Sequence, residues 1–74
     1  VVRAVQRGET LELIAPVSLS DVRIYDMLGG LVASQSVNAH TVKIRITSLA
    51  SGAFLLRTVG ADGRVSVQRF VKDR

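Results

Sequence analysis

The sequence predicts an all-β domain, a sandwich or a barrel of about seven short strands. Hydrophobic residues make up 47% of the chain, and they are mostly Val, Leu and Ile rather than aromatic residues. Polar and apolar residues alternate in several segments, which is the period of a strand with one buried face. Turn-forming residues recur roughly every 8–12 residues, the spacing typical of these architectures.

The length and charge of the chain further limit the kinds of protein that it could be. The chain has 74 residues and no cysteine, so we expect a single domain over residues 1–74 without a disulfide. It does not begin with Met, and we expect it to be a piece of a longer protein. The net charge is +4, but the basic residues are scattered, which favours a solvated basic surface. A small barrel that binds nucleic acid is a rival interpretation, which steep salt-dependent retention on heparin would favour.

The first two expected strands are separated by a turn. The run VVRAVQ at 1–6 is closed by a turn around Gly8, and the run TLELI follows at 10–14. Pro16 is expected to end the second strand, because proline cannot donate a ladder hydrogen bond.

A hairpin is predicted around a double glycine. The runs DVRIYD at 21–26 and LVASQSV at 31–37 flank the turn MLGG. Gly29 and Gly30 allow the positive φ that a tight hairpin needs, and Asp26 can accept hydrogen bonds from the turn backbone.

The clearest alternation follows an expected interruption at Asn38. In the run TVKIRI at 41–46, Val42, Ile44 and Ile46 share one face, and the residues between them are basic. This pattern predicts a strand with one buried face and one solvated face.

The last two strands are expected to form a hairpin around the Asp-Gly pair at 62–63. The run AFLLRTV at 53–59 is apolar on both faces, as in a central strand. The run VSVQRFVK at 65–72 changes phase at Phe70, so we expect a bulge near residues 68 and 69.

Residues that could support catalysis are sparse. His40 is the one histidine and is expected in an exposed turn, with no nucleophile and acid pair around it. Asp21, Asp26 and Asp62 lack the spacing of a calcium loop, and turn-capping roles explain them. Neither phosphate-binding glycine motif occurs. We therefore expect no enzyme activity, no catalytic residue, no metal and no cofactor, and we interpret the chain as a binding, addressing or structural module.

Three motifs in a fixed order resemble a known family. They are VRIYDMLGGLV, then VKIRITSLASGAFLLRTV, then VQRFVK. Together they resemble the type A-like C-terminal sorting domain of the type IX secretion system (Por secretion system) of Bacteroidota. The matching residues are Val22, Ile24, Tyr25, Asp26, Gly29 and Val32 in the first motif; Ile46, Leu49, Gly52 and Leu56 in the second, with Phe54 in place of the usual Tyr; and Val71 and Lys72 in the third, after Arg69 and Phe70. Gly30 stands where the family usually carries Lys or Arg.

The resemblance implies a fold and a function. The fold would be an immunoglobulin-like β-sandwich of about seven antiparallel strands. The function would be a C-terminal secretion and sorting signal, which directs its parent protein across the outer membrane to surface attachment. The implied partners are the type IX translocon, an outer-membrane shuttle β-barrel and a sortase, with anionic lipopolysaccharide after processing. The implied location is the periplasm in transit and then the cell surface or the medium. No nucleic acid is expected as a partner, and edge strands would allow a homodimer.

We assign three groups of site residues. The tail motif, proposed to contact the translocon, is Arg69, Phe70, Val71 and Lys72. The hairpin motif is Tyr25, Asp26, Gly29 and Gly30. The core and turn motif is Leu49, Gly52, Phe54 and Leu56. The alternative is a generic immunoglobulin-like or fibronectin-like adhesion module on the same fold, without a sorting role.

Overall fold

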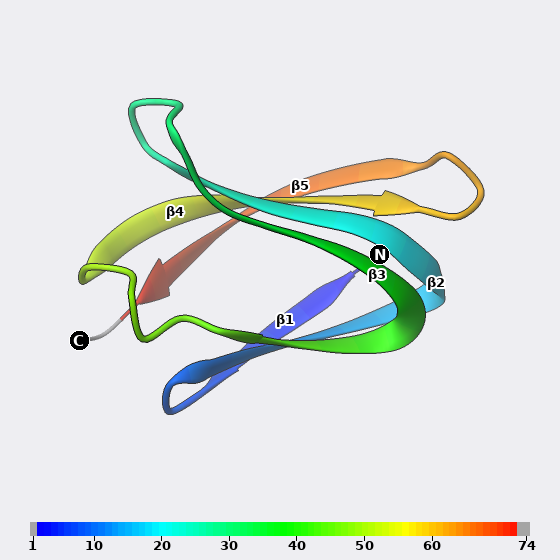
Figure 1. The fold of residues 1–74 in the computed structure, drawn as a ribbon, viewed down its shortest axis with the longest axis horizontal. Coiled ribbons are helices and arrows are strands. Elements are labelled where there is room, and N and C mark those ends of the chain that lie inside the picture. Colours follow the sequence, from blue (N-terminus) through cyan, green and yellow to red (C-terminus); the bar gives the residue numbers. More distant parts are fainter. Residues whose placement is uncertain (1, 73–74) are drawn as a thin grey trace.

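The structure, a computed structural model, describes residues 2–72 and contains five antiparallel β-strands (Figure 1). Val1, Asp73 and Arg74, at the ends of the predicted 1–74 domain, lie outside the described residues. The described residues include no helix that could span a membrane. The strands are β1 (Arg3–Arg7), β2 (Thr10–Asp26), β3 (Leu31–Arg45), β4 (Gly52–Gly60) and β5 (Val65–Lys72).

The number of strands corrects the prediction of seven, partly because β2 is long and bent. It joins the two runs expected at 10–14 and 21–26. Pro16 lies exposed inside this strand and does not end it. The pairing of β2 with β3 shifts register between Ile14 and Leu19, so the ladder is interrupted where proline has no N–H to donate. The strand therefore turns a corner at Pro16 and continues.

The strand β3 bends in the same region and joins the runs expected at 31–37 and 41–46. The predicted interruption at Asn38 is therefore also a bend within one strand. The Asn38 side-chain oxygen accepts a hydrogen bond from the Ser18 hydroxyl at 3.2 Å, which ties the two bent segments together. His40 lies exposed in this bent strand and not in a turn.

These two bends fold one sheet over on itself to make a sandwich (Figure 1). One layer contains β1, the first part of β2 and the second part of β3. The other layer contains the first part of β3, the second part of β2, then β4 and β5. The strand β4 lies between β2 and β5, which confirms the prediction of a central strand.

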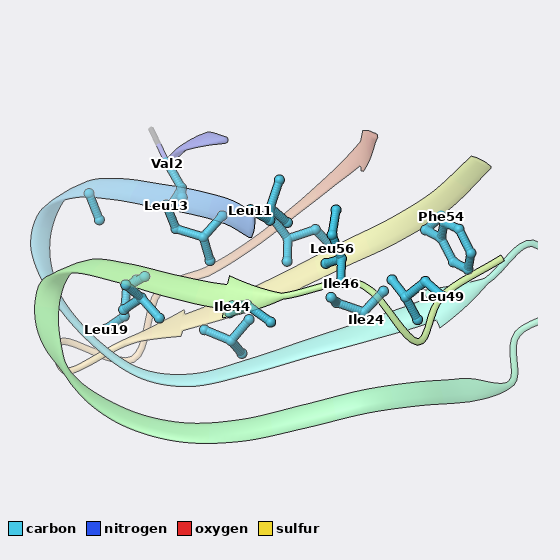
Figure 2. Packing of buried hydrophobic residues seen from close by; sticks show 13 residues of the cluster. Val2, Leu11, Leu13, Leu19, Ile24, Ile44, Ile46, Leu49, Phe54 and Leu56 are labelled. Atoms are coloured by element: carbon cyan, nitrogen blue, oxygen red, sulfur yellow. The ribbon is translucent and has the colours of Figure 1, made fainter. Parts of the chain in front are cut away.

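The core lies between the two layers, and both layers contribute side chains to it (Figure 2). Inward and outward residues alternate along the strands, as predicted for 41–46. The buried apolar residues are Val2, Leu11, Leu13, Ala15, Leu19, Val22, Ile24, Val42, Ile44, Ile46, Leu49, Phe54 and Leu56. Each large side chain of this kind contributes about 1.5–3 kcal/mol by leaving water.

The bulge predicted in β5 is absent, because the phase of this strand differs from the expected one. Its register with β4 is unbroken from the pair Gly52–Lys72 to the pair Val59–Val65. The apolar residues Val65, Val67 and Val71 all point outward and are exposed. The inward row is mostly polar: Ser66, Gln68, Phe70 and Lys72.

Candidate functional site

The three motifs converge at one end of the sandwich, on the left in Figure 1. Asp26 in β2 pairs with Phe54 in β4, and Phe54 pairs with Phe70 in β5. One step further along, Gly52 lies opposite Lys72. Residues far apart in the sequence thus form one surface. We call it the motif end and define it by residues 25–30, 49–56 and 69–72.

The hairpin motif forms a closed turn between β2 and β3. The Asp26 carboxylate accepts hydrogen bonds from the backbone N–H groups of Leu28 (3.0 Å) and Gly30 (2.8 Å). The Asp26 N–H donates to the Gly30 carbonyl at 2.9 Å, and the Gly29 N–H donates to the Asp26 carbonyl at 3.0 Å. Gly29 has a φ of 92°, which favours glycine strongly over other residues. The turn is therefore held rigidly by one acid and one glycine.

The second glycine of the pair has a different role from the expected one. Gly30 is not among the residues with positive φ. A Cβ atom at Gly30 would lie 3.0 Å from one carboxylate oxygen of Asp26, which is a crowded contact. The missing side chain at Gly30 therefore leaves space for the Asp26 carboxylate.

The outer face beside this turn carries Tyr25, which is half-buried, and Arg23, which is exposed. Arg23 also forms an ion pair with Asp21, with 3.0 Å between Nε and Oδ2. A hydrogen bond with Tyr25 and the charge of Asp21 hold the pKa of the Arg23 guanidinium above its ordinary value. Arg23 is thus a permanent positive charge on this face.

The core and turn motif packs beneath the hairpin. The rings of Phe54 and Phe70 stack with centroids 5.6 Å apart. Leu49, Phe54 and Leu56 are buried, and all three lie in the common core (Figure 2). Gly52 has a φ of 139°, a conformation essentially restricted to glycine, where the loop enters β4.

The tail motif is divided between the inside and the outside of the domain. Phe70 packs inward against the core, and Lys72 is buried with its ammonium donating to the Leu49 carbonyl. Arg69 and Val71 point outward and are exposed. These two are the exposed residues of the four, whereas Phe70 is half-buried and Lys72 is buried. The Lys72 ammonium, assigned from the sequence to contact with the translocon, is instead bonded within the domain.

Four exposed apolar residues at the same end were not assigned to the site from the sequence, although Val32 was matched to the first family motif. They surround the β2–β3 turn, with exposed fractions of 55% for Met27, 98% for Leu28, 53% for Leu31 and 40% for Val32. An open pocket separates Val32 from the loop before β4, and Leu49 and Phe54 contribute to its lining. The available sequence signal was an apolar pair in a turn, where polar residues are usual.

The chemistry available at the motif end is that of a contact surface. Among residues 2–72, no group of three His, Asp or Glu side chains is placed to hold a metal ion. The surface instead offers apolar side chains, the outward-facing Arg69 and a strand edge, which can engage another protein.

Comparisons with known proteins identify both the fold and the family. The chain is similar to a DUF3244 family protein with an immunoglobulin-like β-sandwich fold from Bacteroides vulgatus ATCC 8482. The TM-score is 0.81 at 22% sequence identity, over 97% of this chain and 83% of that one. The immunoglobulin-like sandwich is thereby confirmed, with five strands in place of seven.

No curated protein matches the chain. The model of the secretion system C-terminal sorting domain matches residues 9–73. The match covers most of the chain, including the segments that converge at one end of this sandwich, and the chain therefore belongs to the family of secretion system C-terminal sorting domains.

Proposed function

We propose that the chain is a non-enzymatic sorting signal that directs its parent protein through the type IX system across the outer membrane. The family match over residues 9–73 is the observation that carries this proposal. The convergence of all three motifs at one end supports it, because a recognition signal needs its residues on one continuous surface.

The proposed route has three steps. The parent protein crosses the periplasm, and the translocon and a shuttle β-barrel of the outer membrane collect it through this domain. A sortase then removes the domain and attaches the parent protein to anionic lipopolysaccharide, or the protein is released to the medium.

The outward part of the tail motif is the proposed contact with the translocon. Within the described residues β5 pairs with β4 alone, so its other edge carries unpaired backbone groups. A partner can add a strand to such an edge. Arg69 would favour an acidic partner surface, and Val71 would supply apolar contact. Phe70 and Lys72 would hold the strand in place from within. Two copies pairing along the same edge would give a homodimer.

An export assay tests the proposal. A signal peptide and a fluorescent cargo are fused in front of residues 1–74 and expressed in a type IX-competent bacterium. We expect cargo at the surface or in the medium, and retention in the periplasm when residues 71–74 are deleted. Periplasmic retention of the intact fusion, with the domain folded, would refute the proposal.

Two matched substitutions separate recognition from folding. Val71 and Val65 lie on the outer face of the same strand and are almost equally exposed, at 52% and 53%. Only Val71 belongs to the motif end. We expect Val71→Gln to reduce export and Val65→Gln to leave it unchanged, with equal melting temperatures. Equal export by the two variants would remove Val71 from the proposed contact.

The alternative is an adhesion module without a sorting role, which the immunoglobulin-like fold favours. Its function would survive transfer of the domain to an internal position of the fusion. A sorting signal should fail there, because the end of β5 would no longer be free.

A further inference from the structure

The chain contains two hairpin turns with the same backbone, at residues 26–30 and 60–64. In each turn the N–H of the first residue donates to the carbonyl of the fifth, at 2.9 and 2.8 Å. In each, the N–H of the fourth residue donates to the carbonyl of the first, at 3.0 and 2.9 Å. The fourth residue is glycine in both, with φ of 92° at Gly29 and 87° at Gly63. The two turns are therefore internal controls for each other.

They differ in the second and third residues, which form the tip. The turn at 60–64 carries Ala61 and Asp62 there, whereas the turn at 26–30 carries Met27 and Leu28. Leu28 is 98% exposed, so its side chain gains almost nothing from folding. Because the same backbone forms with Ala and Asp, turn formation does not explain the apolar pair.

We infer that Met27, Leu28, Leu31 and Val32, the apolar tip, insert into an apolar pocket on a protein of the secretion machinery. This inference rests on the proposed function and names a second contact for the same end of the domain. The tip projects beyond the body of the sandwich, so it can enter a concave site (Figure 1).

The rigidity of the tip fits an anchor. The Asp26 carboxylate fixes the backbone amides of Leu28 and Gly30, so the apolar side chains are presented from a preformed turn. Preformed anchors lose less conformational entropy on binding, and small central apolar clusters often carry most of the binding energy.

The size and charge of the tip favour a protein pocket over the other occupants. A stable interface uses roughly 20–30 residues on each side, so the four side chains need further contacts, which a machinery protein that also binds the end of β5 would supply. Elements that enter a membrane interface typically combine apolar residues with Lys, Arg or Trp. Residues 26–32 contain none of these, and their one charge, Asp26, belongs to the turn.

The position of the tip fits a shared partner. Val32 and the loop before β4 line one open pocket, and the end of β5 lies opposite that loop through the Gly52–Lys72 pair. A protein that contacts the end of β5 could therefore reach the tip as well.

The test transplants the tip of the second turn into the first. In the export fusion, Met27→Ala with Leu28→Asp should reduce export roughly tenfold or more. The melting temperature is measured alongside export, because Asp62 caps Arg64 from above Gly60, whereas the carboxylate introduced at residue 28 would lie against Asp26, which already caps Gly30. The matched control Leu28→Met keeps the apolar character and should export normally. If the double variant is destabilised, export of the single variant Leu28→Gln provides the test.

The outcomes separate this inference from the proposed function. Normal export of both Leu28→Gln and the double variant would overturn the inference and leave the proposed function standing. Failure of the unmodified fusion to be exported would overturn both. Two further assays compare the wild-type fusion with Leu28→Gln: flotation with vesicles containing anionic lipid, and sedimentation at rising concentration. Vesicle binding or dimerisation that Leu28→Gln abolishes would overturn the protein pocket in favour of a membrane or a second copy.

Discussion

The turn between β2 and β3 and the turn between β4 and β5 have the same pattern of backbone hydrogen bonds. Their exposed tips differ, because the first is apolar and the second carries a charged residue. The first ends in Met27 and Leu28, and the second in Ala61 and Asp62, with Asp62 also paired to Arg64 at 3.5 Å. In the second turn the capping acid, Asp62, is itself a tip residue, whereas in the first turn Asp26 caps the backbone from the first position. The comparison therefore teaches that only the tip of the first turn, Met27 and Leu28, is free of a role in folding. The motif end is thus distinguished by its surface and not by its local architecture.

Removal of the Phe54 ring should have the largest effect on stability. Phe54 is 7% exposed and stacks on Phe70, so Phe54→Ala should cost about 3–5 kcal/mol of unfolding free energy. Urea denaturation measures this loss, which is comparable to the whole stability of a small domain. A loss below about 1 kcal/mol would mean that the motif end is loosely packed.

Matched glycine substitutions test whether the two turns are equivalent. Gly29→Ala and Gly63→Ala should each cost about 1–2 kcal/mol, because alanine is strained at their positive φ. The two losses, measured by thermal denaturation, should agree within about 0.5 kcal/mol. A clear inequality would contradict the shared backbone and weaken the use of one turn as the control for the other.

The two capping acids, Asp26 and Asp62, should contribute different amounts to the unfolding free energy. Asp26 accepts two backbone hydrogen bonds and is half-buried, whereas Asp62 accepts one and is exposed. Asp26→Ala should therefore cost about 1–2 kcal/mol and Asp62→Ala about half as much. Hydrogen exchange of the Leu28 and Arg64 amides would show which turn opens first. Faster opening at Arg64 in the wild-type chain is the expected result, and the reverse would contradict it.

A substitution at Thr58, which lies away from the motif end, should change the unfolding free energy by a smaller amount and in the opposite direction, toward greater stability. Its hydroxyl is buried and has no hydrogen-bond partner among the described residues. Thr58→Val should raise the unfolding free energy by about 1 kcal/mol, because the unpaired polar atom is removed from the core. A loss of stability would indicate that the hydroxyl is satisfied in solution, for example by a bound water.

Most of the local structure was predictable because it depends on near neighbours in the sequence. The alternation in 41–46 and the Asp-Gly turn at 62–63 are signals of this kind, and both are confirmed. The corner at Pro16 was not predictable locally, because proline can end a strand or lie in a bend. The inward face of β5 was also predicted wrongly. Apolar residues usually mark the inward face of a strand, but here the valines face outward and the inward row is mostly polar.

The sequence by itself determined the class, the turns and the family, because periodicity, glycine conformation and motif order are written along the chain. Only the tertiary structure decided which motif residues are available for contact. Lys72 is buried because the carbonyl of Leu49, distant in sequence, accepts its ammonium. Val71 and Leu28 are exposed because no described part of the chain folds over them. Burial depends on contacts between distant segments, so it emerged only when the sheet was folded over on itself.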